Sequence, residues 1–432
     1  MKNKLEKIVE NFKIKIKTFL KNFIEYTIEN DVRIYRLKHT PLKVKKSLIK
    51  RAERTCGKYQ IQRNKVVFDN YMGKSYGGNC KYVTEELLKR NSELEIVWMV
   101  ENVAAHIGEF PKQVRLVEYK SEQAMLEYYT AAVWICNYHL IAYFNKGLQK
   151  RKGQYYIQMW HGALGIKKIE NDCECLTESS SWYYLAEKNS RNTDYWISNS
   201  AFETDVYRRA FWNVNQVLEY GHPRNDLFFG CDLSEVEQKV KQALQIEAEE
   251  NIVLYVPTFR ENGGFPENKI AVGQIVQALG DRFGGSWRMV VRLHPRMQGT
   301  AEHVCDMKNA DHVVTKNYPD IQELLAASQV VITDYSSCIF DFLFTDRPGF
   351  IYAPDVEAYN NERGFYYPLE ETPFPIAEDN EQLIQNVRAF DENSYRRNVK
   401  EFIAGKGCVE DGQAAVRVAE LVENIVQKVG TE

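Results

Sequence analysis

Hydrophobic positions along this chain follow two different periods. Between residues 5 and 23 the apolar side chains recur at i, i+3 and i+4 spacing, and lysines fill most of the opposite face. This pattern predicts a basic amphipathic helix. From about residue 64 onward the apolar residues gather instead in short runs that alternate with helical patterns. Strands that alternate with helices indicate βαβ units and mostly parallel sheets.

The alternation occurs in two series, which indicates two α/β domains. A helical stretch rich in Glu and Lys at 231–250 is expected to link them. The predicted organisation is a basic helical segment at 1–55, domains at 56–230 and 231–412, and a final amphipathic helix at 413–432. Strands are predicted at 65–68, 95–100, 132–136, 155–159, 195–198 and 216–218, and then at 252–256, 287–293, 312–314, 329–333 and 349–352. Helices of the second series are predicted at 270–280, 320–327 and 337–345.

Charge is distributed unevenly along the chain. The 432 residues carry a formal net charge of -3, yet residues 1–54 hold sixteen Lys and Arg against six Asp and Glu, a local balance of +10. Such a segment indicates an anionic partner, either a membrane surface or nucleic acid. Its aromatic residues lie on the apolar stripe and do not alternate with basic residues, so no nucleic acid is expected. We expect residues 1–30 to contact an anionic membrane; the alternative is packing on the chain's own domain or on a second subunit of a homo-oligomer.

Cysteine usage and hydropathy favour a reducing cytosol. Nine cysteines are scattered without a CxxC pair, so neither a disulfide framework nor a zinc module is expected. The first residues do not form a signal peptide, because lysine interrupts the apolar residues every two or three positions. The sequence contains no run of eighteen or more apolar residues, so no transmembrane helix is expected.

Candidate chemistry lies directly after predicted strands, where open parallel sheets bind ligands. His161, Arg260, His294 and Asp334 each follow such a strand. An imidazole with a pKa near neutrality is suited to remove a proton from an attacking hydroxyl, although a lone histidine is more often structural. Two histidines at the ends of separate strands indicate a cleft between the domains, in which a phosphate-handling reaction would fit.

The second domain contributes most of the predicted phosphate contacts. Ser336 or Ser337 is suited to cap the helix that follows, and a helix N-terminus with free N–H groups is a ready anion site. Simple capping is the alternative for these two serines. Arg292, His294 and Arg296 form a cationic corner, and together with Thr258 and Arg260 they are predicted to bind phosphate. The alternative is a capped strand end with solvated charges.

Three further features are expected to be structural or remain ambiguous. The segment 221–226 is expected to close the first domain near the hinge, and Asp341 to lie on a helix surface or in packing. The glycine-rich turn at 73–79 could cradle a phosphate or could be only a tight turn.

Short blocks occur along the chain in this order: Gly73–Tyr76, Gln158–Gly162 with Lys167 and Lys168, Gly221–Asp226, Tyr255–Arg260, Arg292–Pro295, Asp334–Ser337 with Asp341, Arg347–Pro348, Asp355, Tyr359 and Arg363–Tyr366. In these blocks the sequence resembles the CDP-glycerol glycerophosphotransferase family, the TagB/TagF-like enzymes of teichoic-acid synthesis. The resemblance covers about residues 64–427. The family usually has Thr-Pro soon after Trp-His-Gly, where this chain has Ala163–Gly165, and often Trp in place of Phe259. Because the first departure lies beside the expected base, we expect it to affect acceptor choice.

The resemblance implies a GT-B-like enzyme with two Rossmann-like domains that face a cleft. It would transfer glycerol phosphate from CDP-glycerol to a hydroxyl of a lipid-linked or polymeric cell-wall or capsule acceptor at the cytoplasmic face of the membrane, releasing CMP without a metal or other cofactor. A CDP-ribitol or other CDP-alditol enzyme and a GT-B glycosyltransferase are the alternatives. His161 would be the base on the acceptor hydroxyl, and His294 would bind donor phosphate and help stabilise the transition state. The donor side would comprise Thr258, Arg260, Arg292, Asp334, Ser336 and Ser337, and the acceptor side Ser75, Gly162, Lys167 and Lys168.

Overall fold

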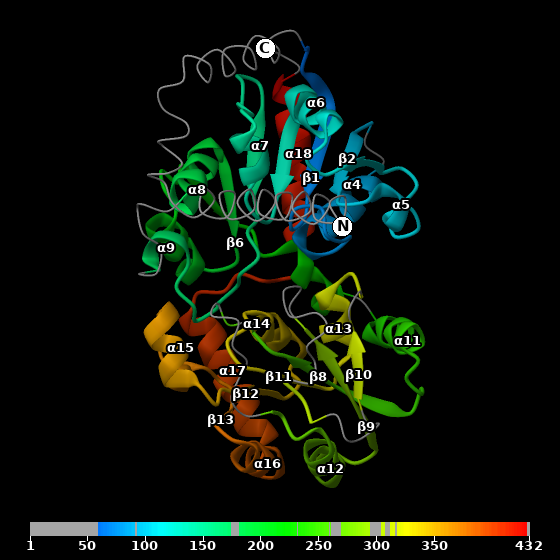
Figure 1. The fold of residues 1–432 in the computed structure, drawn as a ribbon, viewed down its shortest axis with the longest axis vertical. Coiled ribbons are helices and arrows are strands. Elements are labelled where there is room, and N and C mark those ends of the chain that lie inside the picture. The colour runs from blue at the N-terminus through cyan, green and yellow to red at the C-terminus, as the bar shows by residue number, and fades with distance from the viewer. Residues whose placement is uncertain are drawn as a thin grey trace, which may run out of the picture.

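The computed structural model describes residues 59–90, 93–173, 181–230, 232–258, 260, 269–293, 304–306, 312–315 and 318–429. Two α/β domains follow one another along the long axis of the molecule (Figure 1). The predicted N-terminal amphipathic helix and His294 lie outside the described residues. The predicted GT-B-like fold of two Rossmann-like domains is confirmed.

The first domain is built on a parallel sheet of seven strands in the order β3-β2-β1-β4-β5-β6-β7. Its central strand β4 is buried along its whole length, as expected for a parallel sheet covered on both faces. The strands are β1 (Gln62–Asp69), β2 (Glu95–Val100), β3 (Arg115–Glu118), β4 (Ala131–Cys136), β5 (Tyr155–Gln158), β6 (Tyr195–Ser198) and β7 (Gln216–Glu219). The helices are α4 (Gly78–Lys89), α5 (Val103–His106), α6 (Glu122–Thr130), α7 (Ile141–Asn145), α8 (Ser181–Asn192) and α9 (Ala201–Ala210).

The second domain repeats this design with six parallel strands in the order β10-β9-β8-β11-β12-β13. Its strands are β8 (Glu250–Val256), β9 (Ser286–Arg292), β10 (His312–Thr315), β11 (Val330–Thr333), β12 (Gly349–Tyr352) and β13 (Ile376–Ala377). Its helices are α11 (Leu233–Leu244), α12 (Val272–Phe283), α13 (Ile321–Ala327), α14 (Cys338–Phe342), α15 (Val356–Arg363), α16 (Asn380–Arg388) and α17 (Glu392–Gly405). Short turns complete the chain: η1 (Glu170–Asp172), η2 (Pro223–Asp226), α10 (Leu227–Gly230), η5 (Leu343–Thr345) and η6 (Leu369–Glu371).

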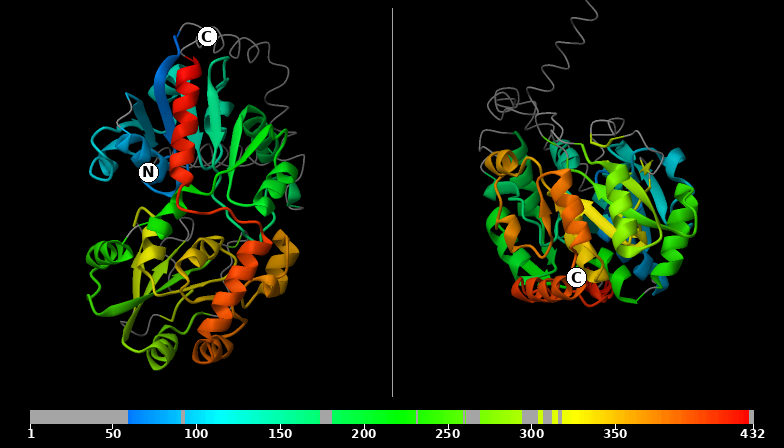
Figure 2. Two further views of the ribbon diagram at one scale, coloured as in Figure 1. Left: turned by 180° about the vertical axis from the view of Figure 1, so that it is seen from behind. Right: turned by 90° about the horizontal axis from the view of Figure 1, so that it is seen from below.

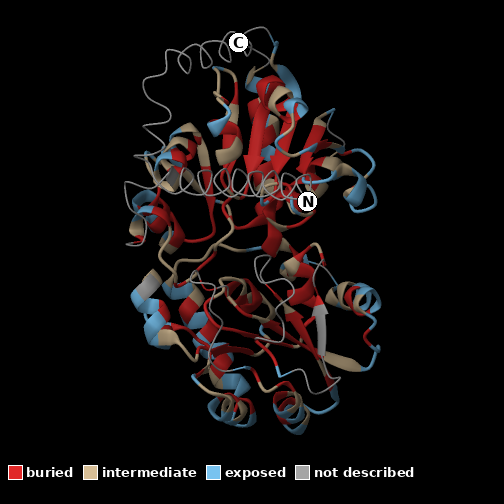
Figure 3. Cartoon of the chain, viewed as in Figure 1, coloured by how far each residue is buried: buried red, intermediate tan, exposed pale blue. Residues whose placement is uncertain are grey.

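Side chains at the helix starts explain several element boundaries. Ser121 precedes α6, Ser200 precedes α9 and Asp320 precedes α13, and each accepts a hydrogen bond from a backbone N–H of the first turn. Such bonds satisfy donors that lack a partner within the helix. The strands and inner helix faces form the buried core, whereas the outer faces of the peripheral helices are exposed (Figure 3).

The last helix, α18 (Ala414–Val429), returns from the second domain to the first. It runs along the strands of the first sheet (Figure 2) and contacts α4. Val418, Val422 and Ile425 of α18 are buried in the core on the face of the sheet that α4 also covers. Asp226 receives hydrogen bonds from the N–H groups of Ala414 and Ala415, at 3.0 and 2.7 Å. The final amphipathic helix is therefore part of the core of the first domain.

Cysteine pairing differs from the sequence expectation at one position. Cys173 is disulfide-bonded, whereas Cys80, Cys136, Cys305, Cys338 and Cys408 are free. Spacing along a chain does not show which cysteines come within bonding distance in the fold, and the sequence therefore did not indicate this bond.

Candidate active site between the two domains

His161 lies in a tight turn immediately after β5. The backbone of Trp160 has a positive φ of 47°, and its N–H donates to the side-chain oxygen of Gln158 at 2.9 Å. The half-buried His161 ring has Nδ1 3.1 Å from the backbone oxygen of Asn137. Because a carbonyl oxygen only accepts hydrogen bonds, Nδ1 carries the proton, and Nε2 keeps its lone pair. Nε2 is therefore available to accept a proton from a substrate.

The surroundings of His161 keep its imidazole neutral. Burial lowers the pKa of His161 to about 3, and the positive charges of Arg224 and Lys167 act in the same direction. The rings of Tyr71 and Tyr138 lie 5.2 and 5.3 Å from the imidazole, centroid to centroid. A neutral imidazole with a free Nε2 is the form that a general base requires.

Two residues beside His161, Tyr71 and Asn137, were not among the candidates chosen from the sequence. Tyr71 follows β1 in a turn where Tyr71, Met72 and Gly73 all have positive φ. Asn137 follows β4, and its side-chain oxygen accepts from the N–H of Tyr71 at 3.1 Å. Applying the strand-end rule to β1 and β4 would have found both positions. Ser75 serves this turn, since its backbone oxygen and hydroxyl accept from Asn70 at 2.8 and 3.2 Å.

In the second sheet, the residues after the carboxyl ends of β8, β11 and β12 are charged or bonded to charged groups. We call this group, which comprises Thr258, Arg260, Asp334 and Asp355, the ionic edge. Asp334 accepts from the N–H and hydroxyl of Thr258, at 2.9 and 2.5 Å, and from Arg260 Nη1 at 2.9 Å. Arg260 also bonds both oxygens of Asp355, at 2.7 and 2.9 Å, and its guanidinium lies 5.0 Å from the Tyr335 ring. Together with a bond to the Thr258 carbonyl, at least four of the five N–H groups of Arg260 have protein partners. Asp334 and Arg260 thus order the strand ends, and at most one N–H of Arg260 points to a ligand.

Ser336 and Ser337 are half-buried in the turn between β11 and α14. Ser337 occupies the N-cap position of α14, but its side chain makes no capping hydrogen bond. The N-cap position of Ser337 is therefore as predicted, whereas its hydroxyl accepts no capping hydrogen bond. Ser337 instead lies against the segment that follows His161, because a Cβ added to Gly165 would stand 3.0 Å from the Ser337 Cβ.

Arg292 ends β9 on the same side of the sheet. Its guanidinium is half-buried and donates to the backbone oxygen of Tyr318. Burial lowers the pKa of Arg292. The role predicted for His294, two residues further on, concerns a residue outside the described part of the chain.

The segment after His161 crosses into the second domain. Leu164 is fully buried in the core of the second domain, and its backbone oxygen accepts from the hydroxyl of Tyr367. Lys167 pairs with Phe365 in an antiparallel bridge, and the N–H of Lys168 donates to the Gly364 oxygen at 3.0 Å. We expected Ala163–Gly165 and the two lysines to border the acceptor. The backbone pairing places this segment against the second domain, and its role toward the acceptor stays a prediction.

Lys167 brings a positive charge to the ionic edge. Burial lowers the pKa of Lys167 to about 8; the charge of Asp334 opposes this shift, whereas those of Arg363 and Arg260 add to it. Its ammonium makes no hydrogen bond or ion pair with any described residue. A half-buried ammonium beside two guanidiniums, with no carboxylate of its own, is suited to bind an anion.

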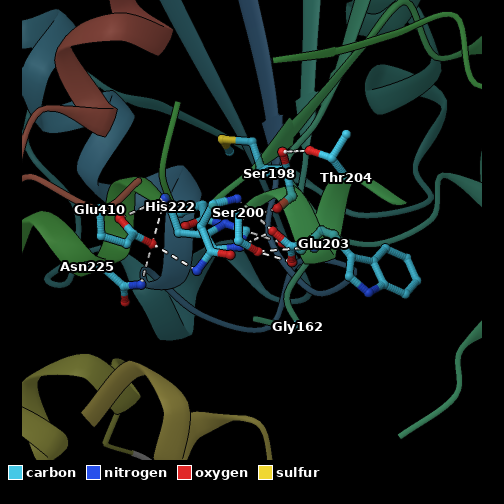
Figure 4. Close-up of polar contacts among 12 residues, drawn as sticks. Gly162, Ser198, Ser200, Glu203, Thr204, His222, Asn225 and Glu410 are labelled. Atoms are coloured by element: carbon cyan, nitrogen blue, oxygen red, sulfur yellow. Dashed lines mark hydrogen bonds and ion pairs between the residues drawn. The ribbon is translucent and has the colours of Figure 1, made fainter. Parts of the chain in front are cut away.

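The segment 221–226, which we expected to close the first domain near the hinge, is bonded to α9 of that domain and to the segment between α17 and α18. His222 bonds Glu203 through Nε2 at 2.9 Å, and Glu410 accepts from the backbone of His222 at 3.1 Å and from Asn225 at 2.8 Å (Figure 4). Glu410 belongs to the crossover between α17 and α18. Asp341 is not a surface residue: it is buried and pairs with Arg224 from the other domain. These two partners are 117 positions apart in the sequence, which hid the pair from sequence reasoning.

Two kinds of feature are absent from the part of the chain that the structure describes. No three side chains of His, Cys, Asp or Glu gather there in a way that could hold a metal ion. Nor does any helix among these residues have the length and apolar character needed to span a bilayer.

Two Rossmann-like domains with a shared site at their facing strand ends, linked by a helix that returns to the first domain, define a GT-B-like protein. The chain belongs to the family described as CDP-glycerol:poly(glycerophosphate) glycerophosphotransferase, whose model matches residues 52–424.

Named relatives and solved structures agree with this assignment. A teichoic acid poly(glycerol phosphate) polymerase of Staphylococcus epidermidis is 25% identical over 98% of this chain, but the chain spans only 60% of that relative's length. A teichoic acid glycerol-phosphate transferase of Staphylococcus aureus is 29% identical, over 83% of this chain and 93% of the relative. The solved wall teichoic acid polymerase TagF has a TM-score of 0.73 at 24% identity, over 92% of this chain and 97% of that one, and so supports the fold.

Proposed function

We propose that this protein transfers glycerol phosphate from CDP-glycerol to a hydroxyl of a lipid-linked or polymeric cell-wall or capsule acceptor, releasing CMP. Family membership supports the reaction class. The observation that carries the proposal is the presence of two unlike groups at the facing strand ends: a neutral imidazole whose Nε2 has no hydrogen bond with a described residue, and an ammonium with no described anionic partner. Phosphoryl transfer requires a base on the attacking hydroxyl and fixed positive charge around the phosphates.

In the proposed reaction, Nε2 of His161 takes the proton of the acceptor hydroxyl. The acceptor oxygen then bonds to the phosphorus that carries glycerol, the bond from that phosphorus to the bridging oxygen breaks, and CMP leaves with the electron pair. Lys167, with the remaining N–H of Arg260, offsets the charge on the diphosphate. The arriving diphosphate raises the low pKa of His161 by its negative charge, which improves the imidazole as a base once the donor is bound.

The remaining donor contacts are proposed from the family motifs and the fold together. Thr258, Ser336 and Ser337 lie at the strand ends or helix start where the donor would bind, and Asp334 holds Thr258 through its N–H and hydroxyl. His294 is proposed to bind the same phosphates.

Product analysis with defined donors tests the proposed function. The purified full chain would be incubated with a synthetic lipid-linked disaccharide, with and without a glycerol phosphate primer, and with CDP-glycerol, CDP-ribitol or a UDP-sugar. We expect CMP release and a mass increase of one or more glycerol phosphate units only with CDP-glycerol. Turnover with CDP-ribitol alone would show that the donor is CDP-ribitol and not CDP-glycerol. Turnover with the UDP-sugar alone would overturn the phosphotransferase assignment.

We further propose that the protein is a peripheral enzyme at the cytoplasmic face of the membrane and that residues 1–30 attach it there. The basic amphipathic pattern and the local charge of +10 support this proposal. Deleting residues 1–30 should abolish co-sedimentation with vesicles that contain anionic lipid. Equal binding of the full chain to neutral and anionic vesicles would contradict it.

A further inference from the structure

Arg224 forms a buried ion pair that joins the two domains. It lies in η2 of the first domain, and its Nε and Nη2 bond the two oxygens of Asp341 in α14, at 2.9 and 3.1 Å. Arg224 is 5% exposed and Asp341 is 4% exposed. A buried bidentate pair of this kind has a defined geometry and is costly to break on one side.

The same guanidinium also holds the peptide that follows the expected base. Nη2 of Arg224 donates to the backbone oxygen of Gly162 at 2.8 Å. The backbone N–H of Arg224 donates to the Asn79 side chain at 3.2 Å, and Asn79 in turn donates to the backbone oxygen of Trp160 at 3.3 Å. The backbone on both sides of His161 is therefore fixed by η2 and its partner Asn79.

The other end of the pair connects to the donor side. Asp341 belongs to α14, the helix that begins directly after Ser337. Gln322 donates to Asp341 at 3.1 Å and to Asn225 of η2 at 3.0 Å, which closes a second link between the domains. A chain of short hydrogen bonds thus runs from the peptide beside His161 to the helix at the donor phosphates.

We propose that Arg224 is a positioning residue for phosphoryl transfer, which together with Asp341 fixes His161 relative to the Ser336–Ser337 turn. This inference rests on the proposed function. It assigns to the buried pair a catalytic consequence beyond the cohesion of the domains, because a base displaced by about 1 Å from its reacting atom loses on the order of 10²-fold in rate.

A second interdomain ion pair provides the matched control. Lys81 of α4 bonds Asp320 and Glu323 of the second domain at 2.9 and 2.7 Å and is likewise buried. It has no hydrogen bond to residues 160–162 among the described residues. Removing Lys81 should weaken the domain contact without moving His161.

The experiment compares Arg224→Gln, Arg224→Lys, Asp341→Asn and Lys81→Met with the wild-type enzyme, using CDP-glycerol and the lipid-linked acceptor. We expect kcat per folded molecule to fall about 10²-fold in Arg224→Gln and Asp341→Asn, with little change in KM for CDP-glycerol. Lys81→Met should lower the thermal midpoint while keeping kcat within about threefold of the wild-type value.

The pH dependence separates positioning from cohesion. The charged and titratable groups that act on the pKa of His161 are His139, Arg224 and Lys167. Loss of the Arg224 charge should raise the pKa of His161, and the acid limb of the kcat profile should move to higher pH because only neutral imidazole accepts the proton. Arg224→Lys keeps the charge without the planar fork, so its kcat should fall while its acid limb stays near that of the wild type.

The titration of the His161 ring can also be followed by NMR, without turnover. A pKa of His161 that rises in Arg224→Gln and stays constant in Lys81→Met supports the inference even if Asp341→Asn folds poorly. The inference is overturned if Arg224→Gln lowers only the thermal midpoint, with kcat and the His161 titration unchanged. A wild-type enzyme that releases no CMP from CDP-glycerol would refute the proposed function instead, and the NMR titration would still report on the environment of His161.

Discussion

The two sheets share the order of their first six strands, but the side chains at the carboxyl ends of these strands differ in charge between the two sheets. The edge of the first sheet is neutral and aromatic: Tyr71, Tyr138 and the uncharged His161 lie there, and the imidazole is held by a backbone carbonyl. At the edge of the second sheet, Arg260 is bonded to two carboxylates, Asp334 and Asp355. The same topology therefore supports a neutral imidazole in one domain and a charged framework in the other.

Lys167 shows how a charged residue of one domain can lie against the other domain while both sheets keep their topology. Lys167 belongs in sequence to the first domain, but its backbone pairs with Phe365 of the second. The charges of Asp334, Arg260 and Arg363 act on the pKa of its ammonium. The crossing segment at 163–169 thus brings a cation that belongs in sequence to the first domain among the charged groups of the second domain. Experiments that separate kcat from donor affinity test this division.

The largest expected effect follows from removing the base. His161→Gln should lower kcat for CMP release by about 10³-fold, within the range that general bases contribute, while the dissociation constant for CDP-glycerol changes little. Initial rates and calorimetric titration measure the two quantities. His106→Gln on the remote helix α5 is the control and should have wild-type kinetics. A decrease in kcat of less than tenfold in His161→Gln would show that His161 is not the general base.

Removing the cation should affect donor affinity instead. Lys167→Met should weaken CDP-glycerol binding by about 10- to 100-fold, the size expected for a hydrogen bond to a charged group. Calorimetry with CDP-glycerol and with cytidine separates the diphosphate contribution from that of the base. Lys89→Met changes a lysine whose side chain is 74% exposed and should bind normally. Equal affinity of Lys167→Met and the wild type would show that the ammonium does not contact the donor.

The titration of Lys167 gives a pH signature of the same contact. Its pKa of about 8 lies below that of an unfolded lysine, so the unfolded chain binds more protons between pH 8 and about 10.4, and this group makes the free protein more stable as pH rises through that window. A bound diphosphate favours the protonated ammonium and raises its pKa. CDP-glycerol binding should therefore weaken above pH 8 and take up protons, measurable by calorimetry in buffers of different ionisation enthalpy. A proton uptake that persists in Lys167→Met would assign it to another group.

Much of the fold could be read from the sequence because parallel sheets need buried apolar strands. Every predicted strand is present in the structure, and the two that were missed, β3 and β13, are edge strands of four and two residues. Short edge strands carry little apolar pattern, since β3 buries a single side chain. Strand ends likewise located His161, Thr258 and Asp334 from the sequence.

The rest of the site depends on contacts between segments that are distant in sequence. No local pattern shows that Leu164 is buried in the second domain or that Arg224 reaches Asp341. Tyr71 and Asn137 were accessible to the strand-end rule but have no charge, and attention to charged residues passed over them. The sequence therefore indicated strand ends that carry candidate residues, whereas the domain against which each residue packs required the fold.

The smallest expected effect concerns Gly165, in the segment that departs from the family pattern. A Cβ at this position would lie 3.0 Å from the Cβ of Ser337, so Gly165→Ala should displace the Ser336–Ser337 turn by a few tenths of an ångström. Mild overpacking of about 1 kcal/mol corresponds to a rise of about fivefold in KM for CDP-glycerol. Gly108→Ala is the control, because nothing lies within 4 Å of the added atom. If Gly165→Ala changed acceptor preference and left the KM for CDP-glycerol unaltered, residues 163–165 would act on the acceptor beside His161, Tyr71 and Tyr138. A change confined to the donor KM would instead assign this segment, despite its place directly after His161, to the ionic edge.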